Sequence, residues 1–275
     1  MDPKGDLDPT ADMYATPEPL QVRIRTHEWY TRPQVDFVDW VVTRIRWQGA
    51  EQVLDVGCGS GAYVERICRR LGRGGRFLAV DISWGMLQGL LANSLPAGAC
   101  LFMADAMHLP LPDKSCDVVL ANHMLYDVPV IEWAVAEGHR VLRPGGRMVT
   151  ATNAQDSMAV FITEMEVACR ALGSPKTFPE IPSRVRFTLE NGASFLKSLF
   201  PRVRREVLTS ALVFEEAAPA VAYVDSLRFV YAPQLPGGLA WEAVLAQVRR
   251  QVEAQIATQG VYRVPKTAGV FIAVR

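Results

Sequence analysis

The sequence of 275 residues lacks any run of about 18 apolar residues, the length that a membrane-spanning helix needs. No membrane span is therefore expected. Its 29 lysines and arginines balance 29 aspartates and glutamates, so no overall positive charge attracts nucleic acid. The first twenty residues carry five acids and four prolines, the reverse of a basic and then apolar secretory signal. We therefore expect a cytoplasmic protein that binds no nucleic acid.

Cysteine and histidine are also scarce. The chain has five cysteines, an odd number without a Cys-x-x-Cys pair, and its four histidines form no cluster with the spacing of metal ligands. This pattern argues against a disulfide framework and a zinc site. We expect reduced cysteines and no bound metal. Nothing in the sequence indicates the oligomeric state.

What the sequence does contain is an alternation of short apolar runs with helical patterns. Strands are expected over residues 51–56, 76–81, 99–104, 116–122 and 147–152, with helices between them, the first helix over about 34–47. Such an alternation predicts a parallel sheet with helices on both faces. Later strands are expected at about 203–213 and 269–274, with helices at about 155–172, 190–199, 216–229 and 239–258.

The strongest local signal is a glycine-rich turn between a strand and a helix, Val-Leu-Asp-Val-Gly-Cys-Gly-Ser-Gly-Ala over residues 53–62. Glycine lets the backbone approach a ligand closely. Three more polar residues, Asp81, Asp105 and Asn122, end or follow the next strands. These loops leave one sheet at its carboxyl edge, where α/β proteins bind ligands. The spacing Gly-x-Gly-x-Gly differs from the Gly-x-Gly-x-x-Gly fingerprint of dinucleotide-binding proteins.

With these motifs the chain resembles class I S-adenosylmethionine-dependent methyltransferases, in the ubiquinone/menaquinone-type and small-molecule subgroup. The matching segments are LDVGCGSG (54–61), VDIS (80–83), ADAMHLPLPDKSCDVVLANHMLYDV (104–128) and VLRPGGRM (141–148). The resemblance implies a Rossmann-like doubly wound α/β sheet of seven strands, mostly parallel with an antiparallel last strand. It further implies an N-terminal segment, 1–33, that is partly disordered or a lid. The methyltransferase domain would be 34–275, with 155–200 and 214–268 contributing a helical substrate cap.

The resemblance also implies how S-adenosyl-L-methionine is held. Asp55 and the backbone of Asn122 would face the methionine ammonium, Asp81 the ribose hydroxyls, and Asp105 the adenine amino group. The remaining predicted contacts, from backbone, apolar and N-terminal groups, are Gly57, Gly59, Gly61, Ile82, Met86, Ala106, Tyr14 and Arg23. Gly61 and Met86 have the alternative of serving only packing.

The candidates for chemistry follow the fourth strand. His123, Tyr126 and Asp127 lie beside the expected position of the methyl group. His123 is the best candidate for a general base or for orienting the acceptor, because an imidazole is neutral near neutral pH. A structural role in the loop is the alternative for His123, and helix capping is the alternative for Asp127.

The function that these features predict is methyl transfer to a small-molecule acceptor. A nucleic-acid or protein methyltransferase is one alternative, although the balanced charge and the absence of an Asn/Asp-Pro-Pro-Tyr/Phe motif after the fourth strand oppose it. A protein that binds S-adenosylmethionine on the same fold without methylating is another, because fold does not fix function. The acceptor atom is not indicated.

Overall fold

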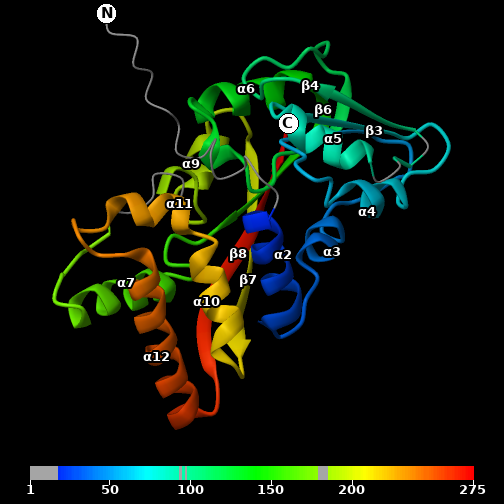
Figure 1. Ribbon diagram of the computed structural model, residues 1–275. Coiled ribbons are helices and arrows are strands. Elements are labelled where there is room, and N and C mark those ends of the chain that lie inside the picture. The colour runs from blue at the N-terminus through cyan, green and yellow to red at the C-terminus, as the bar shows by residue number, and fades with distance from the viewer. Residues whose placement is uncertain (1–17, 93–94, 97, 179–184) are drawn as a thin grey trace, which may run out of the picture. The chain divides into compact units, whose positions relative to one another are not determined.

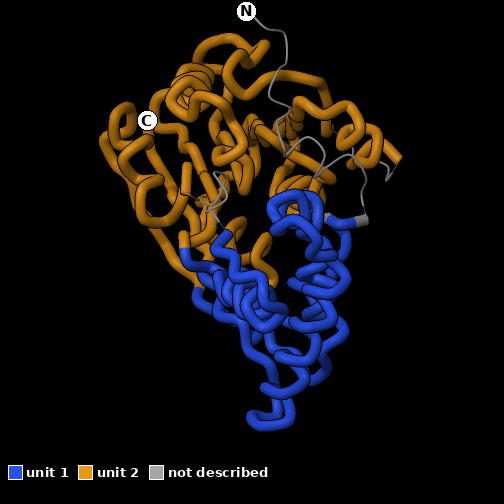
Figure 2. The backbone as a smooth tube through the Cα atoms, turned by 60° about the vertical axis from the view of Figure 1, so that its left-hand side comes forward, with its two compact units in different colours: residues 1–35, 156–180, 209–267 blue, residues 36–155, 181–208, 268–275 orange. Residues whose placement is uncertain are grey.

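The computed structural model describes residues 18–92, 95–96, 98–178 and 185–275. The chain divides into two compact units, each assembled from three segments (Figure 2). Unit 1 takes residues 1–35, 156–180 and 209–267, and unit 2 takes 36–155, 181–208 and 268–275. Of the expected N-terminal segment, 1–33, the first 17 residues lie outside the described part of the chain.

Unit 2 is built on a run of parallel strands. These are β2 (Gln52–Val56), β3 (Arg76–Asp81), β4 (Ala99–Met103), β5 (Cys116–Leu120) and β6 (Leu142–Asn153). Their hydrogen-bonded order is β4-β3-β2-β5-β6, with every neighbouring pair parallel. The strands that the sequence predicts in this region are thus confirmed, although β6 begins at Leu142 rather than at residue 147, and their carboxyl ends lie at one edge of the sheet.

Short helices connect these strands. They are α3 (Phe37–Val42), α4 (Val64–Cys68), α5 (Trp84–Leu91) and α6 (Ile131–Val141), and α9 (Gly192–Lys197) precedes β7. The first helix is shorter than the expected 34–47. It begins where the Asp36 side chain caps the amide of Asp39 at 3.0 Å, and the chain turns directly after Val42.

Three further strands complete the sheet. They are β1 (Thr31–Arg32), β7 (Arg202–Phe214) and β8 (Tyr262–Val274), in the order β1-β7-β8-β6-β5-β2-β3-β4. The last strand is antiparallel to β6, as expected. The sheet has eight strands rather than seven, because a two-residue strand leaves no alternation to detect. β8 also begins before residue 269. The sequence did not indicate this earlier part, because Pro265, Lys266 and Thr267 interrupt its apolar pattern.

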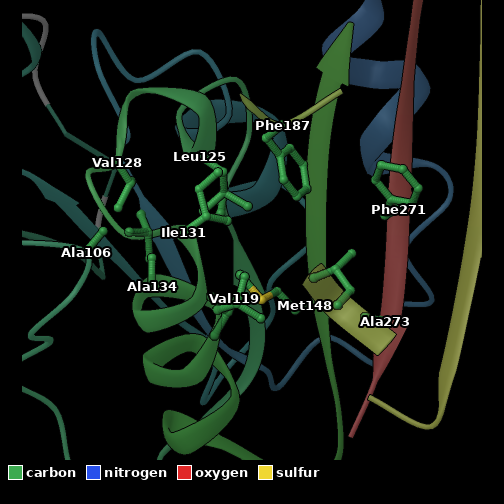
Figure 3. Close-up of a cluster of buried hydrophobic side chains, with 14 of the residues drawn as sticks. Ala106, Val119, Leu125, Val128, Ile131, Ala134, Met148, Phe187, Phe271 and Ala273 are labelled. Carbon is green, nitrogen blue, oxygen red and sulfur yellow. The ribbon is translucent and has the colours of Figure 1, made fainter. Parts of the chain in front are cut away.

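The core of unit 2 forms on both faces of its sheet. Successive residues of β5 alternate between the faces, with Val118 and Leu120 on one and Val119 on the other. On the second face, α6 and the segment after β5 cover the strands (Figure 3). Figure 3 shows Leu125 and Ile131 packed beside Val119 in this layer. The loops after β2 and β5 therefore start from buried strand ends, Val56 and Leu120.

Unit 1 contains the remaining helices. They are α2 (Glu18–Tyr30), α7 (Val160–Ala171), α10 (Ala217–Asp225), α11 (Arg228–Tyr231) and α12 (Trp241–Gln259). α12 packs along α7 and α10 (Figure 1), and the rings of Phe161 and Tyr223 stack with centroids 4.7 Å apart. Strands β7 and β8 each continue from one unit into the other. None of the described helices is both long and apolar enough to cross a bilayer.

Candidate functional site

The glycine-rich turn after β2 leaves room for a ligand at one of its glycines. Gly57 and Gly59 both have left-handed φ angles, 65° and 54°. A Cβ added at Gly57 would come within 2.8 Å of the Met124 side chain, whereas one at Gly59 would have no atom within 4 Å. Gly57 therefore lets the loops after β2 and β5 touch, and the backbone at Gly59 borders open space.

Asp81, the last residue of β3, fixes this turn. One of its carboxylate oxygens accepts a hydrogen bond from the Gly59 amide at 2.8 Å, and the other accepts from the Ser83 amide at 2.9 Å. A carboxylate offers about four lone-pair sites, so acceptor capacity remains on both oxygens. Asp81 can therefore hold its own loop and still accept hydrogen bonds from a ligand.

Asp55 is a buried carboxyl with an unsatisfied oxygen. It lies on β2 with an exposure of 2%, and its Oδ2 has no hydrogen-bond partner. Desolvation, with a smaller contribution from the charge of Asp81, raises the pKa of Asp55 to about 8. A buried acceptor without a partner is rare in native proteins and calls for an explanation such as an absent ligand.

The end of β5 presents a second unsatisfied group. The Asn122 side chain accepts a hydrogen bond from the Ala151 amide at 2.8 Å, which fixes its orientation, and its Nδ2 is buried without a partner. The hydroxyl of Tyr63, just before α4, is likewise buried and unpartnered. Burial raises the pKa of Tyr63 further, so this hydroxyl stays protonated.

Exposed apolar side chains flank the ends of β3 and β4. Ile82 is 71% exposed and Met103 is 61% exposed. Asp105 follows Met103 by two residues, and its carboxylate accepts from the Met107 amide at 2.8 Å and lies 3.6 Å from a His108 ring nitrogen. Large apolar side chains next to an anchored carboxylate suit a flat ring that carries hydrogen-bond donors. No motif in the sequence marks Met103 as a site residue. Its place at the end of β4 is the signal that could have indicated it.

His123 is held in an uncommon backbone conformation directly after Asn122. Its φ is 54°, in the left-handed region that few residues other than glycine occupy. Its amide donates to the Ala151 carbonyl at 2.8 Å, and its ring lies 5.4 Å from that of Phe37. Such an outlier is a reason to suspect function, because it persists only where the surroundings enforce it.

Tyr126 and Asp127 lie in a short 3₁₀ turn, Leu125–Asp127. Arg186, distant in sequence, holds this turn by donating to the carbonyls of Tyr126 at 3.3 Å and Pro129 at 2.7 Å, and to that of Val128. No periodicity or motif marked Arg186, because its contact is made only when the chain folds. The helix that follows, α6, has Val130 as its N-cap residue, three positions after Asp127, and a capping role for Asp127 stays a prediction.

Gly61 has a clear packing role, whereas the contact that the structure gives Met86 is a backbone hydrogen bond. A Cβ at Gly61 would overlap the Leu90 side chain, so this glycine lets α4 and α5 approach. The Met86 amide donates to the Ser83 hydroxyl at 3.4 Å, which caps the start of α5. Whether either residue also touches a cofactor stays a prediction.

The other predicted contacts are less informative. Ala106 is buried at 9% exposure in the core beside Leu109. Arg23 lies on α2 in unit 1, and Tyr14 lies outside the described residues. Among the residues that the structure describes, no three histidines, cysteines, aspartates or glutamates lie close enough together to hold a metal ion.

Comparison with known families places these loops in a known type of domain. Residues 54–150 match the family model described as "Methyltransferase domain". This segment contains β2 to most of β6, together with Asp55, Asp81 and Asn122. All the loops of the site therefore lie within the matched segment.

Curated relatives and solved structures agree with this match. The demethylmenaquinone methyltransferase of Staphylococcus epidermidis is 32% identical over 122 residues, 44% of this chain and 51% of that protein. The malonyl-[acyl-carrier protein] O-methyltransferase of Serratia marcescens is 36% identical over 108 residues, 39% of this chain and 40% of that protein. The chain thus spans about half or less of the length of these relatives. A Bacillus halodurans structure described as a candidate methyltransferase shares the fold, with a TM-score of 0.58, 14% identity, and coverage of 86% of this chain and 97% of that one.

Proposed function

We propose that this chain, whose residues 54–150 match a methyltransferase domain, transfers a methyl group from S-adenosyl-L-methionine to a small-molecule acceptor. The observation that carries the proposal is Asp55, a buried carboxyl with an unpartnered oxygen at the end of β2. The amino-acid part of this cofactor carries an ammonium group. A cation of this kind would satisfy the orphaned oxygen and favour the ionised carboxylate.

The neighbouring residues fit the rest of the cofactor. The open space at Gly59 allows close approach of a ligand to the backbone, and Asp81 keeps acceptor capacity for the two ribose hydroxyls. Ile82 and Met103 offer exposed apolar surface to the adenine ring, with Asp105 as acceptor for its amino group. Asn122 and Tyr63 bring further unsatisfied polar groups to the same edge.

When bound, the cofactor supplies an electrophilic methyl group on a sulfonium. The residues of this chain would bind it, keep water out and place the acceptor in line, and such positioning contributes about 7–11 kcal/mol in favourable cases. We assign this task to the segment after β5, where His123, Tyr126 and Asp127 follow Asn122. His123 would accept the proton of an acceptor that is protonated at working pH, or orient one that is not. Arg186 would keep this segment in position.

The acceptor class is supported by the names of the relatives. One acts on demethylmenaquinone and another on a malonyl group carried by an acyl-carrier protein. We propose a small molecule for this chain as well. Residues 155–200 and 214–268, which follow β6 and β7, are our proposal for the cap over that acceptor.

Two measurements test the proposal. Calorimetry should detect binding of both S-adenosylmethionine and S-adenosylhomocysteine, and NADH should not bind. Incubation with trideuteromethyl-labelled cofactor and a panel of metabolites, followed by mass spectrometry, should reveal a labelled small molecule. NADH binding in place of both would refute the cofactor assignment. Label recovered only in RNA or protein would refute the acceptor class, and cofactor binding without label in any panel member or polymer would point to a non-methylating protein.

A further inference from the structure

A strongly basic cavity lies at the opposite edge of unit 2 from the cofactor loops. Its volume is about 820 Å³, and it is bordered by Arg147 at the start of the paired part of β6 and by Val274 at the end of β8. The cofactor loops lie toward Asn153, six residues further along β6, a span of about 20 Å. The two sites therefore do not share residues.

Cations dominate the wall of this cavity. Six of them line it, and no acid is among the lining residues: Arg44, Arg46, Arg147, Lys197, Arg202 and Arg204. Because the whole chain has zero net charge, this concentration is a local feature rather than part of a generally basic protein. Like charges held together at one concave surface repel one another unless an anion lies between them.

Within the described part of the chain, a single carboxylate offsets this charge. Glu206 pairs with Arg44 at 2.6 Å and with Arg204 at 3.1 Å. Among the residues that the structure describes, the other four cations form no ion pair. Their charge is therefore available to a ligand.

Part of the cavity is also fixed in advance. Arg44 donates to the Trp40 carbonyl at 2.7 Å, and its guanidinium lies 3.6 Å from the centre of the Trp40 ring. Arg147 donates to the Arg46 carbonyl at 2.7 Å. A guanidinium held in one orientation loses little side-chain entropy when it binds an anion, and its fork of donors matches phosphate oxygens.

The wall of the cavity also contains apolar residues. They include Phe200, Val203 and Ile272, of which Phe200 and Ile272 are buried. The volume lies within the range of about 300–1,000 Å³ that small-molecule sites occupy. A cavity of this size, lined by six cations and by apolar residues, suits a ligand that joins several phosphates to an apolar or aromatic part. We propose that this cavity binds an organic polyphosphate of nucleotide size.

The test is a binding titration on the full chain. ATP, pyrophosphate, inorganic phosphate and adenosine are titrated in the presence of saturating S-adenosylhomocysteine, so that adenine cannot bind in the cofactor site. ATP should bind at least about tenfold more tightly than inorganic phosphate, adenosine should not bind, and added salt should weaken the ATP complex. If S-adenosylhomocysteine itself fails to bind, that result contradicts the proposed function and leaves the polyphosphate site open to test. GTP or CTP then replaces ATP as the probe, because neither contains adenine.

Variants locate the site. The double variant R202Q/K197Q removes two exposed cations that have no ion pair and should weaken ATP binding about tenfold or more. The matched control R70Q/R73Q removes two exposed arginines elsewhere in unit 2 and should leave ATP binding unchanged. Equal losses in both variants, or no ATP binding up to about 1 mM, would overturn the proposal. Single-stranded RNA that binds more tightly than ATP and competes with it would replace the small ligand with a polymer, and would also overturn it.

Discussion

The carboxylate of Asp81 accepts a hydrogen bond from the backbone amide of Gly59 at 2.8 Å, which joins the end of β3 to the glycine-rich turn after β2. Two loops of the candidate site are thus held by one side chain. Any ligand that takes its remaining lone pairs meets a turn that is already in place.

Replacing this side chain should weaken cofactor binding severely. Asp81→Ala removes the proposed acceptor of the two ribose hydroxyls, for which each hydrogen bond is worth roughly 1.5–3 kcal/mol with a charged acceptor, and it also frees the Gly59 amide. We expect the dissociation constant of S-adenosylhomocysteine to rise by about 10²-fold or more, measured by calorimetry. Glu65→Gln, which removes an exposed carboxylate on α4, serves as control. An unchanged constant in Asp81→Ala would show that β3 does not carry the ribose site.

Asp55 should make cofactor affinity depend on pH. Its pKa in the free protein is raised to about 8, and an ammonium beside it favours the ionised form. Binding below pH 8 must then release a proton, so affinity should rise up to about tenfold per unit between about pH 6 and pH 8. Calorimetry in buffers of different ionisation enthalpy measures the proton directly. Asp55→Asn should abolish the release, whereas the exposed Asp113→Asn should not.

The same carboxyl affects the stability of the ligand-free protein. Between the ordinary pKa of 3.8 and about 8 the folded state keeps a proton that the unfolded state has released. The free energy of unfolding should therefore fall as pH rises through this window, and Asp55→Asn should flatten that slope in denaturant titrations. A wild-type slope equal to that of Asp55→Asn would contradict the raised pKa.

Two variants distinguish a chemical role of the His123 side chain from a role of its backbone conformation. If His123 accepts a proton from the acceptor, His123→Ala and His123→Asn should both lower turnover by about 10²–10⁴-fold, with little change in cofactor affinity. Because asparagine adopts a positive φ more readily than alanine, only His123→Ala should lose stability, by roughly 1 kcal/mol. Turnover within about threefold of wild type in the asparagine variant would exclude a base role of this size.

Arg186 should act on turnover through the segment after β5. Arg186→Met removes donors to three carbonyls of that segment, and we expect a loss of about 2 kcal/mol in unfolding free energy. We also expect turnover to fall about tenfold as the segment loosens, while the cofactor dissociation constant stays within about threefold. Arg205→Met, which removes a single partly buried hydrogen bond to the Leu189 carbonyl, is the matched control. Equal effects of both variants on turnover would rule out positioning by Arg186.

Lys266 in unit 1 should leave its own signature at alkaline pH. Its ammonium contacts His27 at 3.2 Å and Thr31 at 3.0 Å, and desolvation lowers its pKa from 10.5 to about 8. Between these values the unfolded chain binds the proton that the folded chain has lost. The free energy of unfolding should therefore rise with pH across that window, and Lys266→Met should remove the rise. Parallel pH profiles in both proteins would contradict the shift.

The sequence predicted most of unit 2 because its signals are local. A short apolar run followed by glycine identified β2, and one that ends in aspartate identified β3. Asp55 and Asp81, which lie in these two strands, also marked the candidate site. The prediction failed where a structure depends on distant partners. β1 has only two residues and exists because it pairs with Leu212 and Ala211, and Arg186 reaches the segment after β5 from 57 or more residues away. Nor does any local pattern reveal that the Asp55 oxygen is unpartnered, since burial is a property of the whole sheet.

The interleaving of the two units bears on how the chain is made. Unit 2 takes its final segment, Ala268–Arg275, from the end of β8, which pairs with β6 along Arg147–Asn153. A nascent chain that has already produced all the loops of the candidate site still lacks that strand, and β6 is left with an open edge on the ribosome. Unpaired strand edges are prone to aggregation during synthesis. Translation that stalls before residue 268 should therefore yield a product that chaperones retain, even though every residue of the candidate site has been made.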